Sequence, residues 1–169
     1  LYGLAMSCRT YRALQRDGVA IGRRKLAVND FSKNPILVFD FGPADSPVAE
    51  GAVGVTDESL YTADEGFGWV PEAGDRFSVL SSDPGLPESD LSRDFVSTSG
   101  VTFSVEMPEG FYEVTTLVGS LDSEIVHTGV AIEGVLLFNE SVSEGQILRS
   151  TAQVAVTDGM MDFRIGGLD

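Results

Sequence analysis

The sequence predicts an all-β protein, an antiparallel β-sandwich, and three observations carry that prediction. Apolar residues alternate with polar residues along most of the second half, as in Val101, Phe103, Val105 and Met107, which is the period of a strand with one buried face. Turn residues separate such runs at a spacing of roughly ten residues, as in sandwiches and barrels. A hydrophobic content of 43% and a mean hydropathy of +0.09 are those of a folded chain.

The elements follow in order along the chain. Residues 9–17 predict a short helix that ends at Gly18, and residues 36–41 predict a strand that ends at Gly42-Pro43. Residues 43–100 are rich in Gly, Pro, Ser and Asp, which is typical of loops and short strands. The later strands are bounded by turn residues such as Asp158-Gly159, and we expect them over 101–107, 111–118, 126–133, 135–138, 147–157 and 161–165.

One of these strands contains the only histidine. Val126, Thr128, Val130 and Ile132 alternate and are expected on one side of the strand. His127 is then expected on the opposite face, toward solvent. A nucleophile–His–acid arrangement would need Cys8 or a serine beside it, and no G-x-S-x-G sequence supplies one. The sequence therefore predicts no catalytic residue, and we expect that the domain is not an enzyme by itself.

The charge is divided unevenly along the chain. Net charge is −15, with 26 acidic and 11 basic residues. Residues 1–33 hold seven of the basic residues and two acids, whereas residues 34–169 hold four basic residues and 24 acids. Such asymmetry indicates a boundary. We therefore divide the chain into a basic N-terminal extension or linker, residues 1–34, and a sandwich, residues 35–169.

Composition also excludes several classes of protein. An acidic body argues against nucleic-acid binding, which needs a basic surface to neutralise phosphates. No apolar run reaches the roughly 18 residues that span a bilayer. One cysteine excludes an internal disulfide framework and a cysteine-rich zinc site. We expect a secreted, extracellular protein that binds neither nucleic acid nor membrane, and that is a processed protein or a piece of a longer one.

Several short motifs then carry a family resemblance. The strings Phe39-Asp40-Phe41-Gly42 and Gly66-Phe67-Gly68-Trp69, the segment Asp94-Phe95-Val96, and the strand that follows Pro108-Glu109-Gly110 occur in a characteristic order. The pattern resembles the galactose-binding-like β-sandwich domain found beside catalytic domains in rhamnogalacturonan acetylesterase-like proteins, agarases and related polysaccharide-degrading enzymes. It covers about residues 36–166, and each motif alone is weak.

This resemblance implies a jelly-roll module with a strand beyond Gly167. Since the sequence stops at Asp169, we expect the sandwich to lack that final strand unless another segment supplies it. The basic segment is one candidate to fill the missing edge, and a tail from a neighbouring domain is the other interpretation. The resemblance also implies a polysaccharide or oligosaccharide ligand and a catalytic domain in the same longer chain or complex.

Candidate ligand residues follow from the chemistry of sugars, which offer apolar C–H faces and rings of hydroxyls. Aromatic rings with acidic, amide and guanidinium groups suit both. Tyr61, Phe67 and Trp69 lie in one Gly-containing loop, and Arg93 and Asp94 lie at the end of another. We predict that these five residues bind sugar. The alternative is that Phe67 and Trp69 are core residues and that Arg93 is an ordinary surface residue.

Calcium is the cofactor that the sequence raises. Hard cations prefer six to eight oxygen ligands, and Asp40, Asp45 and Glu50 cluster near the first strand of the resembling region. Domains of the resembling type often carry a structural Ca²⁺, so these three acids are the candidate ligands. The alternative is a set of solvated acids.

Two functions are expected ahead of a third, an enzyme in its own right such as a lyase or esterase fragment, which would require a cleft with perturbed ionisable groups. The first is a non-catalytic carbohydrate-binding accessory module of an extracellular polysaccharide-active enzyme, such as a carbohydrate esterase, glycoside hydrolase or polysaccharide lyase. The second is a structural or interaction domain that packs on a catalytic domain or a partner and has no sugar site. Exposure of Trp69 discriminates between them, because the first predicts an exposed ring and the second a buried one.

Overall fold

The computed structural model describes residues 4–10, 20–21, 24–25, 36–71, 79–82, 95–98, 100–120 and 124–166. These residues form strands, turns and loops and contain no helix, so within them nothing resembles a membrane-spanning helix. The strands are β1 (Leu4–Thr10), β2 (Ala20–Ile21), β3 (Arg24–Lys25), β4 (Ile36–Phe41), β5 (Val53–Val55), β6 (Phe67–Val70), β7 (Val79–Ser82), β8 (Phe95–Thr98), β9 (Val101–Glu106), β10 (Gly110–Ser120), β11 (Ile125–Ile132), β12 (Val135–Val142), β13 (Gln146–Val156) and β14 (Met160–Gly166).

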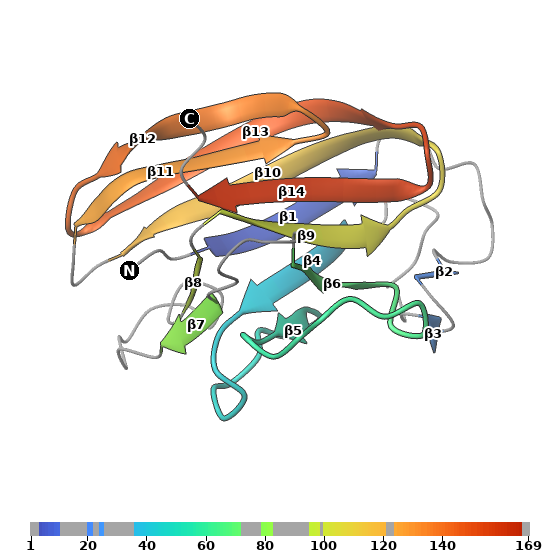
Figure 1. Cartoon of the computed structure of the whole chain (residues 1–169), viewed down its shortest axis with the longest axis horizontal. Coiled ribbons are helices and arrows are strands. Elements are labelled where there is room, and N and C mark those ends of the chain that lie inside the picture. Colours follow the sequence, from blue (N-terminus) through green and yellow to red (C-terminus); the bar gives the residue numbers. More distant parts are fainter. Residues whose placement is uncertain are drawn as a thin grey trace.

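Two five-stranded sheets face each other across the core (Figure 1). One has the strand order β13-β10-β1-β4-β5 and the other β12-β11-β14-β9-β6, and two small ribbons, β2-β3 and β7-β8, stand apart from them. All pairings are antiparallel except that of β4 with β5. The predicted all-β sandwich is confirmed, and the apolar alternation explains it because each long strand turns one face toward the other sheet.

The N-terminal segment contributes an inner strand. β1 pairs with β10 on one side over Leu4–Thr10, and with β4 on the other side over Met6–Arg9. These seven residues were assigned to an extension or linker, so for them that interpretation needs correction: the segment fills a middle position in a sheet rather than an edge. The helix predicted over 9–17 is also wrong at Arg9 and Thr10, which lie in β1. Residues 11–17 lie outside the described part.

The core is built around an aromatic cluster. Phe103 on β9 is fully buried, and its ring meets those of Phe39, Phe41 and Trp69 at centroid distances of 5.3, 5.1 and 5.1 Å in edge-to-face geometry. Aromatic pairs favour this geometry because the positive edge of one ring meets the negative face of the other. β4, β6 and β9 each supply rings to this cluster, so it joins the two sheets through their apolar faces.

A β-bulge in β11 changes which of its residues face the core, so the alternation predicted for that strand is wrong at its start. The pairing of β11 with β12 shifts between Ile125 and Thr128. Ile125 is fully buried, whereas Val126, which was expected beside Thr128 in the core, is 62% exposed. Since a bulge inserts an extra residue, the alternation restarts after it. The side chain of His127 lies outside the described part, so its expected orientation stays a prediction.

Candidate functional site

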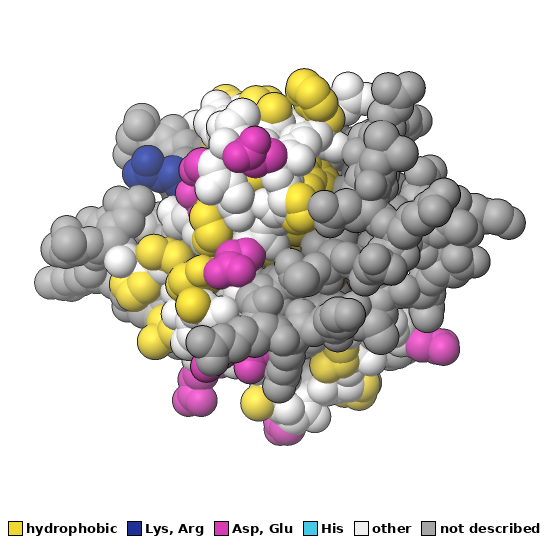
Figure 2. Space-filling view, turned by 90° about the vertical axis from the view of Figure 1, so that its right-hand side faces the viewer, with side chains coloured by type: hydrophobic (Ala, Val, Ile, Leu, Met, Phe, Trp, Pro, Cys, Tyr) yellow, Lys and Arg dark blue, Asp and Glu magenta, His cyan; other side chains and the backbone are white. Residues whose placement is uncertain are grey.

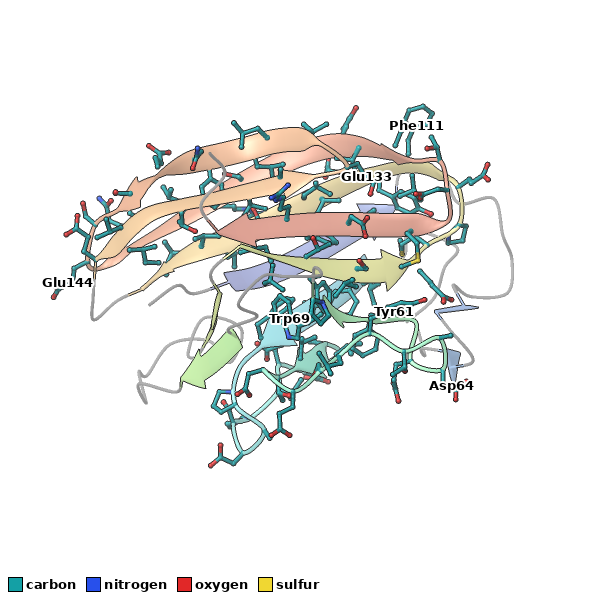
Figure 3. All side chains as sticks on the ribbon, in the orientation of Figure 1. Tyr61, Asp64, Trp69, Phe111, Glu133 and Glu144 are labelled. Carbon is teal, nitrogen blue, oxygen red and sulfur yellow. The ribbon has the colours of Figure 1, made fainter. Side chains whose placement is uncertain are left out.

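The aromatic residues proposed as a sugar platform point into the core. Trp69 is fully buried, with a relative exposure to solvent of 0%. Its ring packs on Phe41 and Phe103, and its indole N–H donates a hydrogen bond of 2.7 Å to the carbonyl of Thr56. Phe67 is likewise buried, against Phe39. The expectation of exposed stacking rings is therefore wrong for both residues, and the core alternative holds (Figure 3).

Tyr61 lies beside these rings but is half-exposed. Its hydroxyl donates a hydrogen bond of 2.7 Å to Oε1 of Glu106 on β9. This hydrogen bond, followed by burial and by the negative charge of Glu106, raises the pKa of the Tyr61 hydroxyl above its ordinary value. A Tyr–Glu pair of this kind fixes a loop and offers both a phenol and a carboxylate at the surface.

The approach of that loop to β6 depends on a glycine. A Cβ atom at Gly68 would lie 2.4 Å from the backbone nitrogen of Tyr61, and Gly68 has a φ of +143°. Only a residue without a side chain adopts this conformation here without strain. The Tyr61 backbone also pairs with that of Trp69, through an N–H donated to the Trp69 carbonyl at 3.0 Å. The two glycines around Phe67 therefore mark close packing of the loop rather than an exposed ligand loop.

The remaining predicted ligand residues are two on a second loop and three proposed calcium ligands. Arg93 and Asp94 lie outside the described residues, so their role stays a prediction. Among the proposed calcium ligands, Asp40 is buried and its Oδ2 accepts a hydrogen bond of 2.8 Å from the N–H of Ala49, whereas Asp45 and Glu50 are exposed. No three metal-ligating side chains gather in the part of the chain that the structure describes. The assignment of Asp40, Asp45 and Glu50 as calcium ligands therefore stays a prediction.

A second polar group lies on the outer face of the other sheet. The N–H of Asp162 on β14 donates to Oε1 of Glu133 at 2.7 Å, and the N–H of Glu133 donates to the Asp162 carbonyl at 3.1 Å. The Ser104 hydroxyl donates to the Asp162 carboxylate at 2.6 Å. Burial, and the negative charges of Asp158 and Asp162, raise the pKa of Glu133 even though the hydrogen bond from Asp162 lowers it. The Glu133 side chain therefore adds a hydrogen bond to the backbone of β14 just beyond the paired residues of β11 and β14.

Sequence patterns did not single out Phe111 on β10, which is the most exposed aromatic side chain among those whose burial the structure describes. Its relative exposure is 72%, and it points away from the sandwich (Figure 3). The neighbouring residues Tyr112 and Val114 are buried, so the alternation of β10 places Phe111 on the outer face. That alternation was readable in the sequence.

The outer face around Phe111 is mostly polar. The register of β10 with β13 pairs Phe111 with Ala155, Glu113 with Gln153, Thr115 with Thr151 and Leu117 with Arg149. The two threonine hydroxyls hydrogen-bond each other at 2.9 Å. β13 is the edge strand of its sheet. We name this surface the β10–β13 strip, consisting of Phe111, Glu113, Thr115, Leu117, Arg149, Thr151, Gln153 and Ala155.

The described body of the sandwich is strongly acidic. Residues 36–71, 100–120 and 124–166 contain sixteen Asp and Glu residues and two arginines, Arg149 and Arg164. Figure 2 shows acidic side chains spread over one end of the molecule, among apolar and uncharged ones. A surface of this sign repels acidic polymers unless counterions screen it.

Comparison with known proteins places this fold. A family model described as "Beta-agarase/YXIM esterase-like, galactose-binding domain-like" matches residues 37–166. The uncharacterized esterase YxiM of Bacillus subtilis (strain 168) is 30% identical over 132 residues, which are 77% of this chain and 32% of YxiM.

A solved structure agrees with this match. The crystal structure of protein YxiM from Bacillus subtilis aligns with a TM-score of 0.53 and 24% sequence identity, over 78% of this chain and 35% of that one. At this identity the likeness shows the fold alone. The chain therefore spans about a third of the length of the relative it matches, and most of YxiM has no counterpart in it.

Proposed function

Because this chain belongs to the beta-agarase/YXIM esterase-like family of galactose-binding-like domains, we propose that it is a non-catalytic carbohydrate-binding module of an extracellular polysaccharide-active enzyme. The family match over residues 37–166 is the observation that carries the proposal. It covers the sandwich apart from β1, and the alignment with YxiM covers about a third of that relative. In this proposal catalysis belongs to a separate domain of the same chain or complex, and the sandwich holds the polysaccharide close to it.

The contacts of the ionisable residues support a binding role over a catalytic one. The hydroxyl of Tyr61 and the carboxylate of Glu133 have raised pKa values. Both have structural partners that account for them, since Tyr61 fastens a loop to β9 and Glu133 continues a β-ladder.

The charge of the body favours a neutral ligand. Sixteen acids against two arginines would repel a uronic acid polymer such as pectate. Neutral sugars carry no such penalty and bind through apolar faces and hydroxyls. We therefore propose a neutral polysaccharide or oligosaccharide as the ligand and a secreted setting, where polymers of this kind are met.

A glycan-binding screen tests the proposal. The purified chain is applied to an array of neutral and acidic plant and algal polysaccharides, and hits are repeated by isothermal titration calorimetry at 0.15 M and 0.5 M salt. The same protein is assayed for hydrolysis of p-nitrophenyl acetate. We expect binding to a neutral polymer and no hydrolysis above a buffer control. Absence of binding to every polymer, or sustained turnover, would contradict the proposal.

One observation favours a second candidate function, a structural or interaction domain without a sugar site. Trp69 and Phe67 are committed to the core, so the loop expected to form the sugar platform does not do so. In that case the sandwich would pack on a catalytic domain or a partner. A negative glycan screen together with co-purification of a stable complex with the catalytic portion of the same protein would favour this function.

A further inference from the structure

We propose that the β10–β13 strip is a binding site for a neutral pyranose-containing oligosaccharide, with Phe111 as the stacking platform. This inference rests on the proposed carbohydrate-binding function and names its site. No comparison assigns a ligand to these residues, and the strip lies on a sheet face rather than in the loops at the ends of the strands.

The first step of the argument is the exposure of the Phe111 ring. Large aromatic side chains normally lie in the core, and Phe111 is 72% exposed while its neighbours Tyr112 and Val114 are buried. Its cross-strand partner on the outer face is Ala155. Because alanine ends at Cβ, it covers little of the ring, so an apolar face of the ring stays open for the C–H face of a sugar.

The second step is the chemistry that follows Phe111 along the strip. Glu113 and Gln153 form the next outward pair, and Thr115 and Thr151 the one after it. Successive outward pairs lie about 7 Å apart along a strand. Thr115 is buried and its hydroxyl is bonded to that of Thr151, so the groups open to sugar hydroxyls are the Glu113 carboxylate, the Gln153 amide and the exposed Thr151 hydroxyl. Beyond them, Arg149 adds a guanidinium with further donors.

The third step is the openness of the strip. Gln153, Thr151 and Arg149 are exposed, and β13 is the edge of its sheet. Within the described residues no strand pairs with the free edge of β13, although β12 lies close to it. A chain of sugar units would therefore lie over the exposed side chains of the strip rather than beside its edge. The strip combines one aromatic ring with polar pairs at regular spacing, whereas an ordinary surface hydrophobic residue stands alone among unrelated neighbours.

The charges around Phe111 bear on the class of sugar. The Glu113 carboxylate lies one outward pair from the ring, with Arg9 opposite it in the β1–β10 register, so the acidic body as a whole rather than Glu113 alone would repel a uronic acid. A neutral hexose or pentose unit instead offers hydroxyls that donate to this carboxylate. The strip is therefore expected to bind neutral oligosaccharides and to discriminate against acidic ones of the same length.

Three single variants test the platform, and a fourth, Gln153→Ala, tests the polar part of the strip. Phe111→Ala removes the platform, Phe111→Trp keeps a larger one, and Val126→Ala removes an exposed apolar side chain that is 62% exposed on the other sheet. Each is titrated calorimetrically with neutral tetra- to hexasaccharides made from the polymer that the wild-type chain binds, and with oligogalacturonates. Thermal melting of each variant confirms folding, which exposed substitutions leave intact.

The expected result is selective. Phe111→Ala should weaken binding of the neutral oligosaccharide by about tenfold, whereas Phe111→Trp and Val126→Ala should bind within about twofold of wild type. In two-dimensional NMR, the amides of Gln153 and Ala155 should shift on titration. As a second chemical probe of the strip, Gln153→Ala should also weaken binding.

The opposing results separate the two proposals. If the wild-type chain binds a neutral oligosaccharide and Phe111→Ala and Gln153→Ala bind it equally well, the strip is not the site, although the proposed function stands. If acidic oligosaccharides bind as tightly as neutral ones, the argument from the charge of the body fails. If the wild-type chain binds no sugar, both the site and the proposed function are overturned.

Discussion

Replacement of Phe103 by leucine tests whether ring geometry, beyond hydrophobic burial, holds the sandwich together. Phe103 is fully buried and makes three edge-to-face contacts at centroid distances of 5.1–5.3 Å. At about 0.5–1.5 kcal/mol for each pair, their loss is expected to cost about 1.5–4.5 kcal/mol. Leucine keeps most of the apolar volume and side-chain transfer free energy, so the change probes mainly the aromatic contacts.

Phe163→Leu is the matched control. Phe163 on β14 is also buried, and its one ring contact described here is with Phe103, at 6.2 Å and tilted. Both substitutions remove the same atoms from the same core, so their difference isolates ring geometry. We expect Phe103→Leu to be less stable than Phe163→Leu by about 1–3 kcal/mol.

Equilibrium unfolding in urea measures both variants. The transition is followed by far-UV circular dichroism and by the fluorescence of Trp69, which is the only tryptophan, and free energies are compared at a common slope. Equal losses in the two variants, or a greater loss in Phe163→Leu, would show that the edge-to-face contacts add nothing beyond burial.

Three further substitutions probe single contacts. Glu133→Gln keeps the acceptor oxygen but removes a carboxylate whose pKa is raised in the folded state, so the wild type gains stability as the pH falls through that pKa. The variant should therefore melt about 1–2 °C higher than wild type at pH 7, and the difference should vanish near pH 4. An equal difference in melting temperature at both pH values would contradict this. Gly68→Ala should lower the free energy of unfolding by more than about 2 kcal/mol, because the new Cβ meets the Tyr61 backbone. Gly51→Ala should lower it by about 1 kcal/mol, since Gly51 has a φ of +79° but nothing within 4 Å of its Cβ position. Urea midpoints in the opposite order would refute the argument from packing. Thr116→Val should stabilise the fold by about 1 kcal/mol, because the buried Oγ1 of Thr116 has no hydrogen-bond partner among the described residues. Thr115→Val should destabilise the fold, because it removes the hydrogen bond between the Thr115 and Thr151 hydroxyls. A loss of stability in both variants would show that the Thr116 hydroxyl makes a favourable interaction.

The strands of the second half were predictable because their signal is local. In β9, Val101, Phe103 and Val105 are buried while Thr102 and Glu106 are less so, which is the alternation that the sequence shows. The hairpin turn at Asp158-Gly159 was likewise evident in its residue types, and β14 follows it. Wherever the period of the side chains alone determines which face is buried, sequence analysis and structure agree.

The errors arose where pairing between distant segments decides the outcome. β1 lies between β10 and β4, and no short-range pattern in residues 4–10 indicates partners more than a hundred residues away. The bulge in β11 places Val126 on the outer face. This bulge belongs to the pairing of β11 with β12, which the sequence of β11 alone does not indicate. Residue composition placed a charge boundary near residue 34, but charge reports surface chemistry and not strand order.

Strand parity explains both the rejected platform and the proposed one. Phe67 and Trp69 pair with Val105 and Phe103, which face the core, and the position between them is a glycine against which the Tyr61 backbone lies. β6 therefore has no ring left to offer to solvent. On β10 the order is reversed: Tyr112 takes the core position, and Phe111 is left on the outer face beside an alanine. The glycines around Trp69 suggested an accessible loop, yet a glycine next to an aromatic residue serves close packing as readily as it serves ligand access. In this sandwich, the face of the strand decides whether Phe67, Trp69 or Phe111 can reach the surface, and the number of aromatic residues in a loop does not.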